Sequence, residues 1–137
     1  MMTMNPPNVL VVDDDPDFVA YVKTVLEADG ISVAAAYDGE DALEQVREEP
    51  PDLVTLDIQM PRKTGVLFYR QMKAEERLRA IPVIVVTGLR RMDLYAAPFI
   101  QAFFEVEHRK LPVPEAYLDK PVSREELVKT VREYLAA

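Results

Sequence analysis

Three consecutive aspartates, Asp13, Asp14 and Asp15, directly follow the apolar run of residues 8–12. Two carboxylates about 4 Å apart repel each other by roughly 4 kcal/mol at an effective dielectric constant typical of protein surfaces. Such crowding is tolerable where a cation, a charged ligand or solvent relieves the repulsion. Mg²⁺ is one such cation, because it takes oxygen ligands and is commonly held by one or two carboxylates together with a phosphate group.

The elements that must position these aspartates follow from hydrophobic patterning. Five short apolar runs have the length of strands that are buried on both faces; they cover residues 8–12, 31–36, 53–56, 83–87 and 116–119. Helical patterns fill the gaps between them. This strict alternation predicts a doubly wound α/β fold, in which a five-stranded parallel sheet carries helices on both faces.

Capping residues and apolar periodicity predict four helices: from Pro16 to a stop at Gly30, over residues 39–48, over residues 65–76, and from Ser123 to about Leu135. Asp38 is a typical cap for the second helix. Ser123 and Glu126 form a capping-box pattern at the start of the last. Phe18 lies on the apolar face of the first helix.

The segment of residues 88–116 is longer than one crossover requires and contains three prolines. Because proline is unfavourable inside a helix, we expect a helix from about Pro98 to Glu107 and extended backbone over residues 111–116. The segment has more aromatic and apolar side chains than one crossover helix needs: Tyr95, Phe99, Ile100, Phe103 and Phe104. They either pack within the segment or form a site for a partner or a second copy.

Composition excludes several classes of protein. With 137 residues and 49% hydrophobic content, the chain forms one domain, expected over residues 8–137 after a short tail of residues 1–7. The net charge of −8 argues against direct nucleic-acid binding. The chain has no cysteine, no secretory signal pattern and no apolar run long enough to span a bilayer, so a cytoplasmic location with no membrane contact is expected.

Further polar residues follow the other predicted strands. Asp57 follows the third, Thr87 ends the fourth, and Lys120 follows the fifth. In an open parallel sheet, ligands bind at the carboxyl ends of the strands. We therefore expect a carboxylate, a hydroxyl and an amine to meet the three aspartates at one edge.

This set of residues resembles the receiver domain of two-component response regulators, which has a chemotaxis-protein-like, flavodoxin-like fold. The resemblance covers nearly the whole chain. It is carried by the acidic pair after the first strand and by four further features: Asp57 before the Met60–Pro61 pair, Gly65, Thr87 followed by a small residue, and Lys120–Pro121. The resemblance implies a strand order of 2-1-3-4-5. One departure is "PVPEAY" before the fifth strand, where the usual receiver has a glycine, so the turn there must be built differently.

The resemblance implies a phosphorelay function and not a turnover enzyme. Asp57 would accept a phosphoryl group from a histidine kinase or a phosphotransfer protein. Mg²⁺ would be bound directly by Asp14 and through water by Asp13, with Asp57 and the main-chain carbonyl of Gln59 as further ligands. Asp15 matches no invariant position of the family and is expected to cap the following helix.

The remaining implied roles concern the switch. The Thr87 hydroxyl and the Lys120 amine would bind the phosphoryl group, and Tyr117 would act with Thr87 as a conformational switch. A downstream protein partner would bind through the region of residues 89–120 and the last helix. A phosphorylation-dependent homodimer is a further expectation.

Two alternatives stay open on the sequence. A haloacid-dehalogenase-like phosphatase would use Asp13 and Asp15 as nucleophile and general acid, with Thr87 and Lys120 in supporting roles. That family usually needs a second acidic pair late in the chain, where only Asp119 is available. A pseudo-receiver would keep the fold without the chemistry, and it is disfavoured because every reactive position is occupied.

Overall fold

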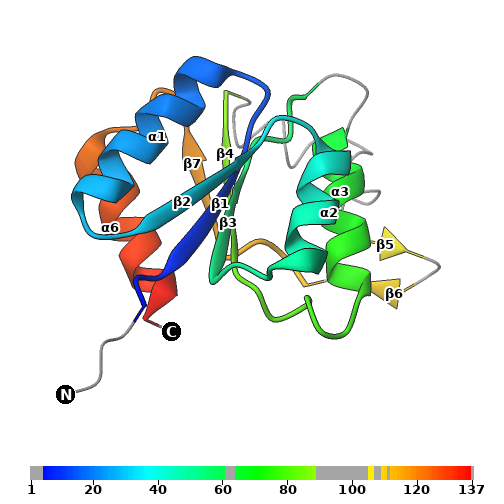
Figure 1. Ribbon diagram of the computed structural model, residues 1–137. Helices are drawn as coiled ribbons and strands as arrows, with labels where there is room; N and C mark the ends of the chain where they lie inside the picture. Colours follow the sequence, from blue (N-terminus) through cyan, green and yellow to red (C-terminus); the bar gives the residue numbers. More distant parts are fainter. Residues whose placement is uncertain (1–4, 61–63, 89–104, 107–108, 111, 137) are drawn as a thin grey trace.

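The computed structural model describes residues 5–60, 64–88, 105–106, 109–110 and 112–136 (Figure 1). Its main sheet has five parallel strands in the order β2-β1-β3-β4-β7. Their bounds are β1 Asn8–Val12, β2 Ser32–Ala36, β3 Leu53–Leu56, β4 Val83–Thr87 and β7 Ala116–Asp119. The predicted doubly wound sheet and its 2-1-3-4-5 order are confirmed, with β7 as the fifth strand.

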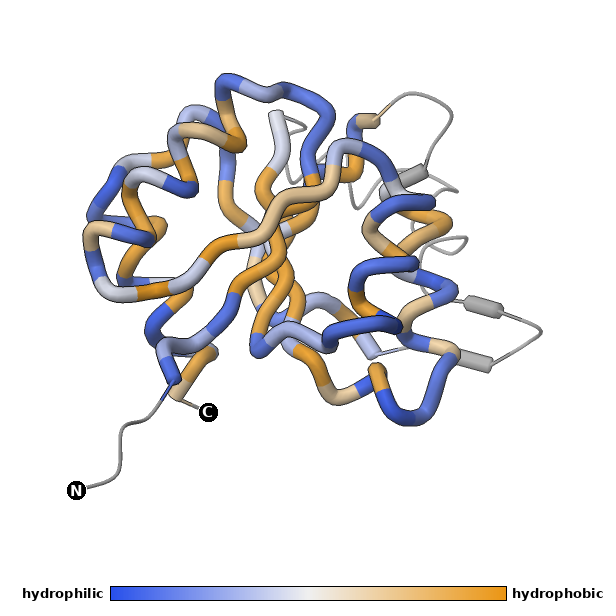
Figure 2. The backbone as a smooth tube through the Cα atoms, in the orientation of Figure 1, coloured by the Kyte–Doolittle hydropathy of each residue, from blue (hydrophilic) through white to orange (hydrophobic). Residues whose placement is uncertain are grey.

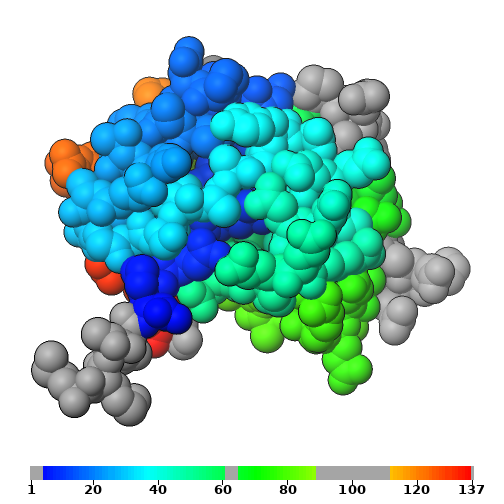
Figure 3. All heavy atoms as spheres, in the orientation of Figure 1, coloured from blue at the N-terminus to red at the C-terminus, as the bar shows by residue number. Residues whose placement is uncertain are grey.

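Within the residues just given, four helices lie in two layers around this sheet: α1 Pro16–Ala28, α2 Gly39–Glu48, α3 Thr64–Ala74 and α6 Arg124–Leu135. In Figure 1, α1 and α6 lie on one face of the sheet, and α2 and α3 lie on the other. The chain enters at the lower edge in this view, so the carboxyl ends of the strands lie at the upper edge. Figure 3 shows α1 and α2 on either side of the edge strand β2.

Strand alternation produces one hydrophobic core on each face. In β1, Leu10 and Val12 face the core under α2 and α3, whereas Val9 and Val11 face the core under α1 and α6. All four side chains are at most 2% exposed. The central strands are therefore mainly apolar, as the hydropathy colouring of Figure 2 shows, because both of their faces are buried. The buried Thr55 and Thr87 are the polar exceptions in β3 and β4.

The helix starts have the predicted caps. Asp38 Oδ1 accepts a hydrogen bond from the N–H of Asp41 at 2.7 Å, and Ser123 Oγ accepts from that of Glu126 at 3.1 Å. Past the end of α1, Gly30 adopts a φ of +80°, a left-handed conformation that glycine reaches without strain. The third predicted helix differs at both ends, since α3 begins one residue earlier, at Thr64, and ends at Ala74.

The helix predicted over residues 98–107 is wrong at its end. Strand β5, Glu105–Val106, pairs antiparallel with β6, Arg109–Lys110. The backbone groups of residues 105–106 bond across this hairpin and not along a helix. Figure 1 shows the hairpin beside α3. Residues 98–104, together with the apolar side chains predicted as an interaction surface, lie outside the described residues.

Glu115 builds the turn at which the resemblance led us to expect a glycine. Its backbone N–H donates to the carbonyl of Val83 at 2.9 Å, and its Oε1 accepts from the N–H of Val83 at 2.7 Å. One residue thus satisfies both backbone groups of Val83 at the start of β4. The turn before β7 is held by a side chain where a glycine would supply none.

Lys73 binds the backbone of the loop that connects α3 to β4. Although it is a lysine, it is only 1% exposed, and its Nζ donates to the carbonyls of Arg79 at 3.0 Å and Ile81 at 2.5 Å. Burial lowers the pKa of its ammonium group, and the negative charge of Glu115 opposes part of this effect.

The lowered pKa of Lys73 predicts a pH dependence of stability. Between the folded-state pKa and the ordinary value of 10.5, the unfolded chain binds more protons than the folded chain, so the Lys73 contribution to the free energy of unfolding rises with pH. Urea unfolding of wild type and Lys73→Met between pH 7 and 10 measures this contribution. We expect the wild-type free energy of unfolding, relative to that of the variant, to increase towards pH 10. A difference that stays flat or falls contradicts the prediction.

Candidate functional site

The candidate site lies at the carboxyl edge of the sheet, on backbone that continues the strand ladder. The first residue past each of three strands donates its N–H to the last residue of a neighbouring strand: Asp13 to Ala36 at 3.0 Å, Asp57 to Val12 at 2.9 Å, and Lys120 to Thr87 at 2.9 Å. The backbone atoms from which these three side chains project are therefore fixed by the sheet itself.

Lys120 bridges two carboxylates. Its Nζ lies 2.7 Å from Asp13 Oδ2 and 3.4 Å from Asp57 Oδ2. The other oxygen of each carboxylate accepts a backbone hydrogen bond at 2.9 Å, Asp13 from Asp15 and Asp57 from Gln59. Both carboxylates thus divide their oxygens between the lysine and a local turn.

Burial and charge act in opposite directions on these groups. Asp13 is 1% exposed and Asp57 5% exposed. Burial raises the pKa of Asp13, and the hydrogen bond from Lys120 offsets only part of that rise. Burial alone would lower the pKa of Lys120, but the hydrogen bond to Asp13 and the nearby charge of Asp57 outweigh it and raise that pKa. Lys120 is therefore a firmly charged ammonium at neutral pH.

Asp13, Asp14 and Asp57 form a group that could hold a metal ion, since they offer carboxylate oxygens within 4.8 Å of one another. Three carboxylates against one ammonium leave an excess of negative charge. Oxygen donors and this charge are what Mg²⁺ requires, so the donor set fits the ion. Asp15 is not part of the group, because its side chain instead caps α1 by accepting from the N–H of Asp17 at 2.9 Å.

Thr87 is buried at the end of β4, 1% exposed, and its Oγ1 donates to Gln59 Oε1 at 3.4 Å. The next residue, Gly88, leaves room for this amide, because a Cβ at Gly88 would lie 3.2 Å from Gln59 Oε1. The hydroxyl predicted for the site therefore faces the loop that follows Asp57.

Gly65 allows α3 to approach the same loop. A Cβ at this position would lie 2.5 Å from the backbone oxygen of Asp57 and 3.1 Å from Cα of Ile58. Side-chain Cβ atoms do not reach such distances from backbone, so only glycine fits here. This contact gives the Gly65 of the sequence motif a steric explanation.

The remaining predicted residue, Tyr117, lies on β7 opposite Val85 of β4. Its side chain is half-buried and packs against the core under α2 and α3. This places it three residues before Lys120, on the sheet itself.

Phe18 was predicted only as part of the apolar face of α1. In the structure, Lys120 Nζ lies 4.3 Å from the centre of the Phe18 ring. The sequence could not show this contact, because the two residues are near opposite ends of the chain.

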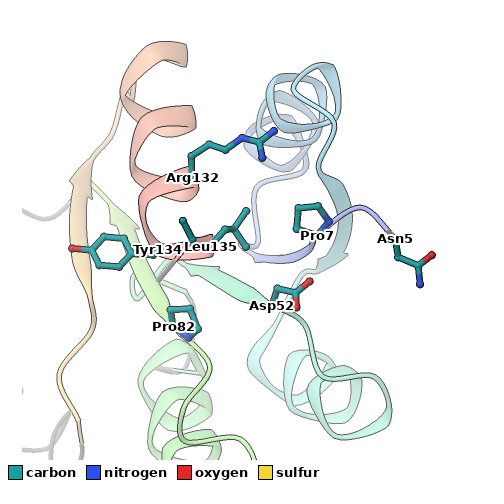
Figure 4. Close-up of a pocket in the computed structure, with 8 residues that line it drawn as sticks. Asn5, Pro7, Asp52, Pro82, Arg132, Tyr134 and Leu135 are labelled. Atoms are coloured by element: carbon teal, nitrogen blue, oxygen red, sulfur yellow. The ribbon is translucent and has the colours of Figure 1, made fainter. Parts of the chain in front are cut away.

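A hollow lies at the amino edge of the sheet, beside the end of α6 (Figure 4). It measures about 550 Å³, and Asp52, Arg132 and Tyr134 are among its lining residues. Asp52 Oδ2 accepts from the N–H of Asn8 at 2.7 Å, and Arg132 Nε donates to Asp29 Oδ2 at 2.7 Å. These charged groups already have partners, so the hollow lacks the crowded charge of the opposite edge.

Among the described residues, no helix is both long and apolar enough to cross a bilayer.

The doubly wound fold with an acidic group at its carboxyl edge agrees with the resemblance to receiver domains. The model of the response regulator receiver domain matches residues 9–132. The chain belongs to this family. It is thus a phosphorelay switch of two-component signalling and not a turnover enzyme, and the phosphatase and pseudo-receiver alternatives gain no support.

Individual relatives agree with this assignment. The chain is 30% identical over 130 residues to the polar-differentiation response regulator DivK of Brucella anthropi, covering 95% of this chain and 97% of the relative. A putative response regulator from Chloroflexus aurantiacus has a similar structure, with a TM-score of 0.75 and 29% identity over 96% of this chain and 99% of the other. The chemotaxis protein CheY4 of Vibrio cholerae shares the fold, with a TM-score of 0.76 and 24% identity over 94% and 98% of the two chains.

The close approach at Gly65 predicts that Gly65→Ala destabilises the protein. Alanine ordinarily stabilises a helix interior relative to glycine by about 1 kcal/mol, but the 2.5 Å contact with Asp57 oxygen is to backbone and cannot relax cheaply. We expect the free energy of unfolding, measured in urea, to fall by about 1–3 kcal/mol.

Gly88→Ala is the matched control for this substitution. Its Cβ would meet only the end of the Gln59 side chain, which can move aside, so its loss should be smaller. A Gly65→Ala protein as stable as wild type would contradict the steric explanation.

Proposed function

We propose that Asp57 is the residue that accepts the phosphoryl group. The observation that carries this proposal is the environment of its carboxylate, which is buried at the strand edge, paired with the ammonium of Lys120 and grouped with Asp13 and Asp14. Phosphoryl transfer depends mainly on positioning and on stabilising negative charge. The fixed backbone of Asp57 supports the first requirement, and the Lys120 ammonium with a cation held by the carboxylates would supply the second.

The proposed reaction is a covalent transfer to oxygen. A carboxylate oxygen of Asp57 forms a bond to phosphorus as the bond between phosphorus and the donor's histidine nitrogen breaks. The electron pair of the broken bond stays on that nitrogen, which takes up a proton as neutral imidazole. The product is an aspartyl phosphate, and its hydrolysis by water regenerates the carboxylate and releases inorganic phosphate.

Around this reaction, the neighbouring residues have distinct proposed roles. Lys120 would pair with a phosphoryl oxygen, and the Thr87 hydroxyl would donate to another. Asp14, Asp13 through a water molecule, Asp57 and the main-chain carbonyl of Gln59 are the residues that would hold Mg²⁺. When bound, this ion would neutralise charge on the phosphoryl group.

The switch would follow from these contacts. Moving a two-state equilibrium from about 1% to about 99% requires roughly 5.5 kcal/mol of differential interaction, and a hydrogen bond to a charged group supplies roughly 1.5–3 kcal/mol. Contacts from Thr87 and Lys120 to one phosphoryl group are of the right size. Thr87 ends β4 and Tyr117 lies on the adjacent β7, so these two residues are the proposed switch pair.

The proposed partners follow from the family. A histidine kinase or a phosphotransfer protein would supply the phosphoryl group, and a downstream protein would read the region of residues 89–120 and the last helix, α6. Phosphorylation-dependent pairing of two copies through this region is a further proposal. Residues 89–104 lie outside the described part of the chain, so these proposals rest on the family and on the sequence.

The first test of the proposed acceptor is intact mass after incubation with a small phosphodonor and Mg²⁺. We expect one added phosphoryl group in wild type and none in Asp57→Asn, because the amide nitrogen and oxygen are poor nucleophiles. Asp52→Asn is a suitable control, since Asp52 lies at the opposite edge of the sheet. Modification that persists in Asp57→Asn but disappears in Asp13→Asn would instead favour the phosphatase alternative.

A second test concerns the proposed metal ligands. Asp14 is exposed and pairs with no lysine or arginine within the described residues, so Asp14→Ala should leave the fold intact or stabilise it by relieving repulsion. Thermal melts with and without Mg²⁺ measure the stabilisation by bound ion, which reaches about 2.7 kcal/mol at 100 times the Kd. We expect it in wild type and not in Asp14→Ala.

Asp17→Ala controls for the loss of a nearby carboxylate. Asp17 is exposed in the first turn of α1 and does not belong to the acidic group. Its variant should retain the stabilisation by Mg²⁺. Equal stabilisation of Asp14→Ala and wild type would count against Asp14 as a ligand.

A further inference from the structure

The ammonium of Lys120 has a third neighbour besides its two carboxylates. The centre of the Phe18 ring lies 4.3 Å from Nζ, well within the distance at which an ammonium is attracted to an aromatic face. A lysine ammonium has three N–H donors, and Asp13 and Asp57 accept from it at 2.7 and 3.4 Å. The aromatic ring therefore covers a further side of the group.

The same turn of α1 also holds the backbone beyond Lys120. Tyr21 lies three residues after Phe18 on the same face of the helix, and the two ring centres are 6.2 Å apart. The Tyr21 hydroxyl donates to the carbonyl of Val122 at 2.8 Å. The segment from Lys120 to Val122 thus contacts α1 at two points, the ammonium of Lys120 and the backbone carbonyl of Val122.

The position of Phe18 is itself fixed relative to the acidic group. Asp15 caps α1 and directly follows Asp13 and Asp14, so the start of the helix lies next to these two members of the acidic group. Phe18 lies in the first turn of that helix and is half-buried against the core under α1 and α6. Moving the ring away from Lys120 would also cost it contacts with that core.

A neutral ring differs from a carboxylate in how it holds an ammonium. The carboxylates of Asp13 and Asp57 draw Nζ towards themselves and compete for it. The ring attracts the charge without demanding a particular N–H direction, so it can stay in contact whichever oxygen the ammonium bonds. It keeps Nζ beside the carboxylates of Asp13 and Asp57 and leaves the choice of oxygen open.

From this arrangement we propose that Phe18 is a positioning residue for phosphoryl transfer. Its aromatic face holds the Lys120 ammonium beside the carboxylates of Asp13 and Asp57. This inference rests on the proposed function, because it takes the Lys120 amine to pair with the transferring group. Phe18 itself would touch neither the phosphoryl group nor the metal ion.

The direct test measures the contact and its consequence in the full chain. In wild type, the ring current of Phe18 should shift the NMR signals of the Lys120 Cε protons upfield, and Phe18→Leu should abolish this shift. With a small phosphodonor and saturating Mg²⁺, Phe18→Leu should slow phosphorylation by about two- to fivefold, the size of one aromatic–ammonium contact at a partly exposed site. Phe18→Tyr keeps the aromatic face, so its ring-current shift and its phosphorylation rate should both match those of wild type.

A double substitution separates positioning from a merely structural role. If Phe18 acts through Lys120, Phe18→Leu should cause no further slowing in a Lys120→Met background. Tyr134→Leu is the matched control, because Tyr134 packs against the same core at the opposite edge (Figure 4). It should leave the phosphorylation rate unchanged.

The outcomes distinguish the two levels of the proposal. An unchanged phosphorylation rate in Lys120→Met would overturn the proposed role of Lys120. The ring-current shift seen in wild type would still show that Phe18 and Lys120 are in contact. A slow Lys120→Met with a normal Phe18→Leu would overturn the role of Phe18 alone. Equal slowing by Phe18→Leu with and without the lysine, or by Tyr134→Leu, would show a general effect on the fold and would likewise overturn it.

Discussion

The pairing of one ammonium with two buried carboxylates is the interaction on which the site depends. Asp13 and Asp57 are almost inaccessible to solvent, and burying an unpaired charge is far more costly than burying a pair. Lys120 reaches both from the far end of the chain. The pairing is incomplete because Asp14 adds a third carboxylate. A divalent cation bound at this edge would neutralise that residual charge.

Backbone hydrogen bonds of the sheet fix the positions of the three residues that form this pairing. Asp13, Asp57 and Lys120 each extend the hydrogen-bond ladder by one residue past their strand, so their Cα positions follow from strand register. Gly65 lets α3 pack against the loop that follows Asp57. Glu115, directly before β7, binds the backbone at the start of β4. An error of one residue in register would turn these side chains to the other face of the sheet.

Much of this arrangement could be predicted from the sequence. The five strands are short, mainly apolar runs. Three helices are capped by residues with short acceptor side chains, Asp15, Asp38 and Ser123. These are local signals, because a strand buried on both faces and a capped helix are each encoded within a few neighbouring residues. The meeting of acidic, hydroxyl and amine groups then followed from parallel strand topology alone.

The features that could not be predicted depend on contacts between distant residues. Glu115 reads as an ordinary surface carboxylate until its oxygen is seen on the N–H of Val83. Lys73 reads as a solvated lysine, yet its ammonium is bonded to two carbonyls in the core. The hairpin at residues 105–110 has strands of only two residues each, too short for a periodicity signal. The periodicity of α1 predicts Phe18 as a core residue, and its ring does pack against the core under α1 and α6. Its contact with Lys120 could not be predicted from that pattern.

The unequal distances of Lys120 from its partners bear on how the proposed switch could work. Its Nζ is nearer to Asp13, at 2.7 Å, than to Asp57, at 3.4 Å, so the weaker contact is to the proposed acceptor. Converting the Asp57 carboxylate into an aspartyl phosphate would add about one negative charge on that side. The added charge would draw the ammonium of Lys120 towards Asp57. Because the Lys120 backbone N–H is bonded to Thr87, a shift of the lysine bears on the end of β4 as well. The two residues proposed to bind the phosphoryl group are therefore already joined through the backbone before it arrives.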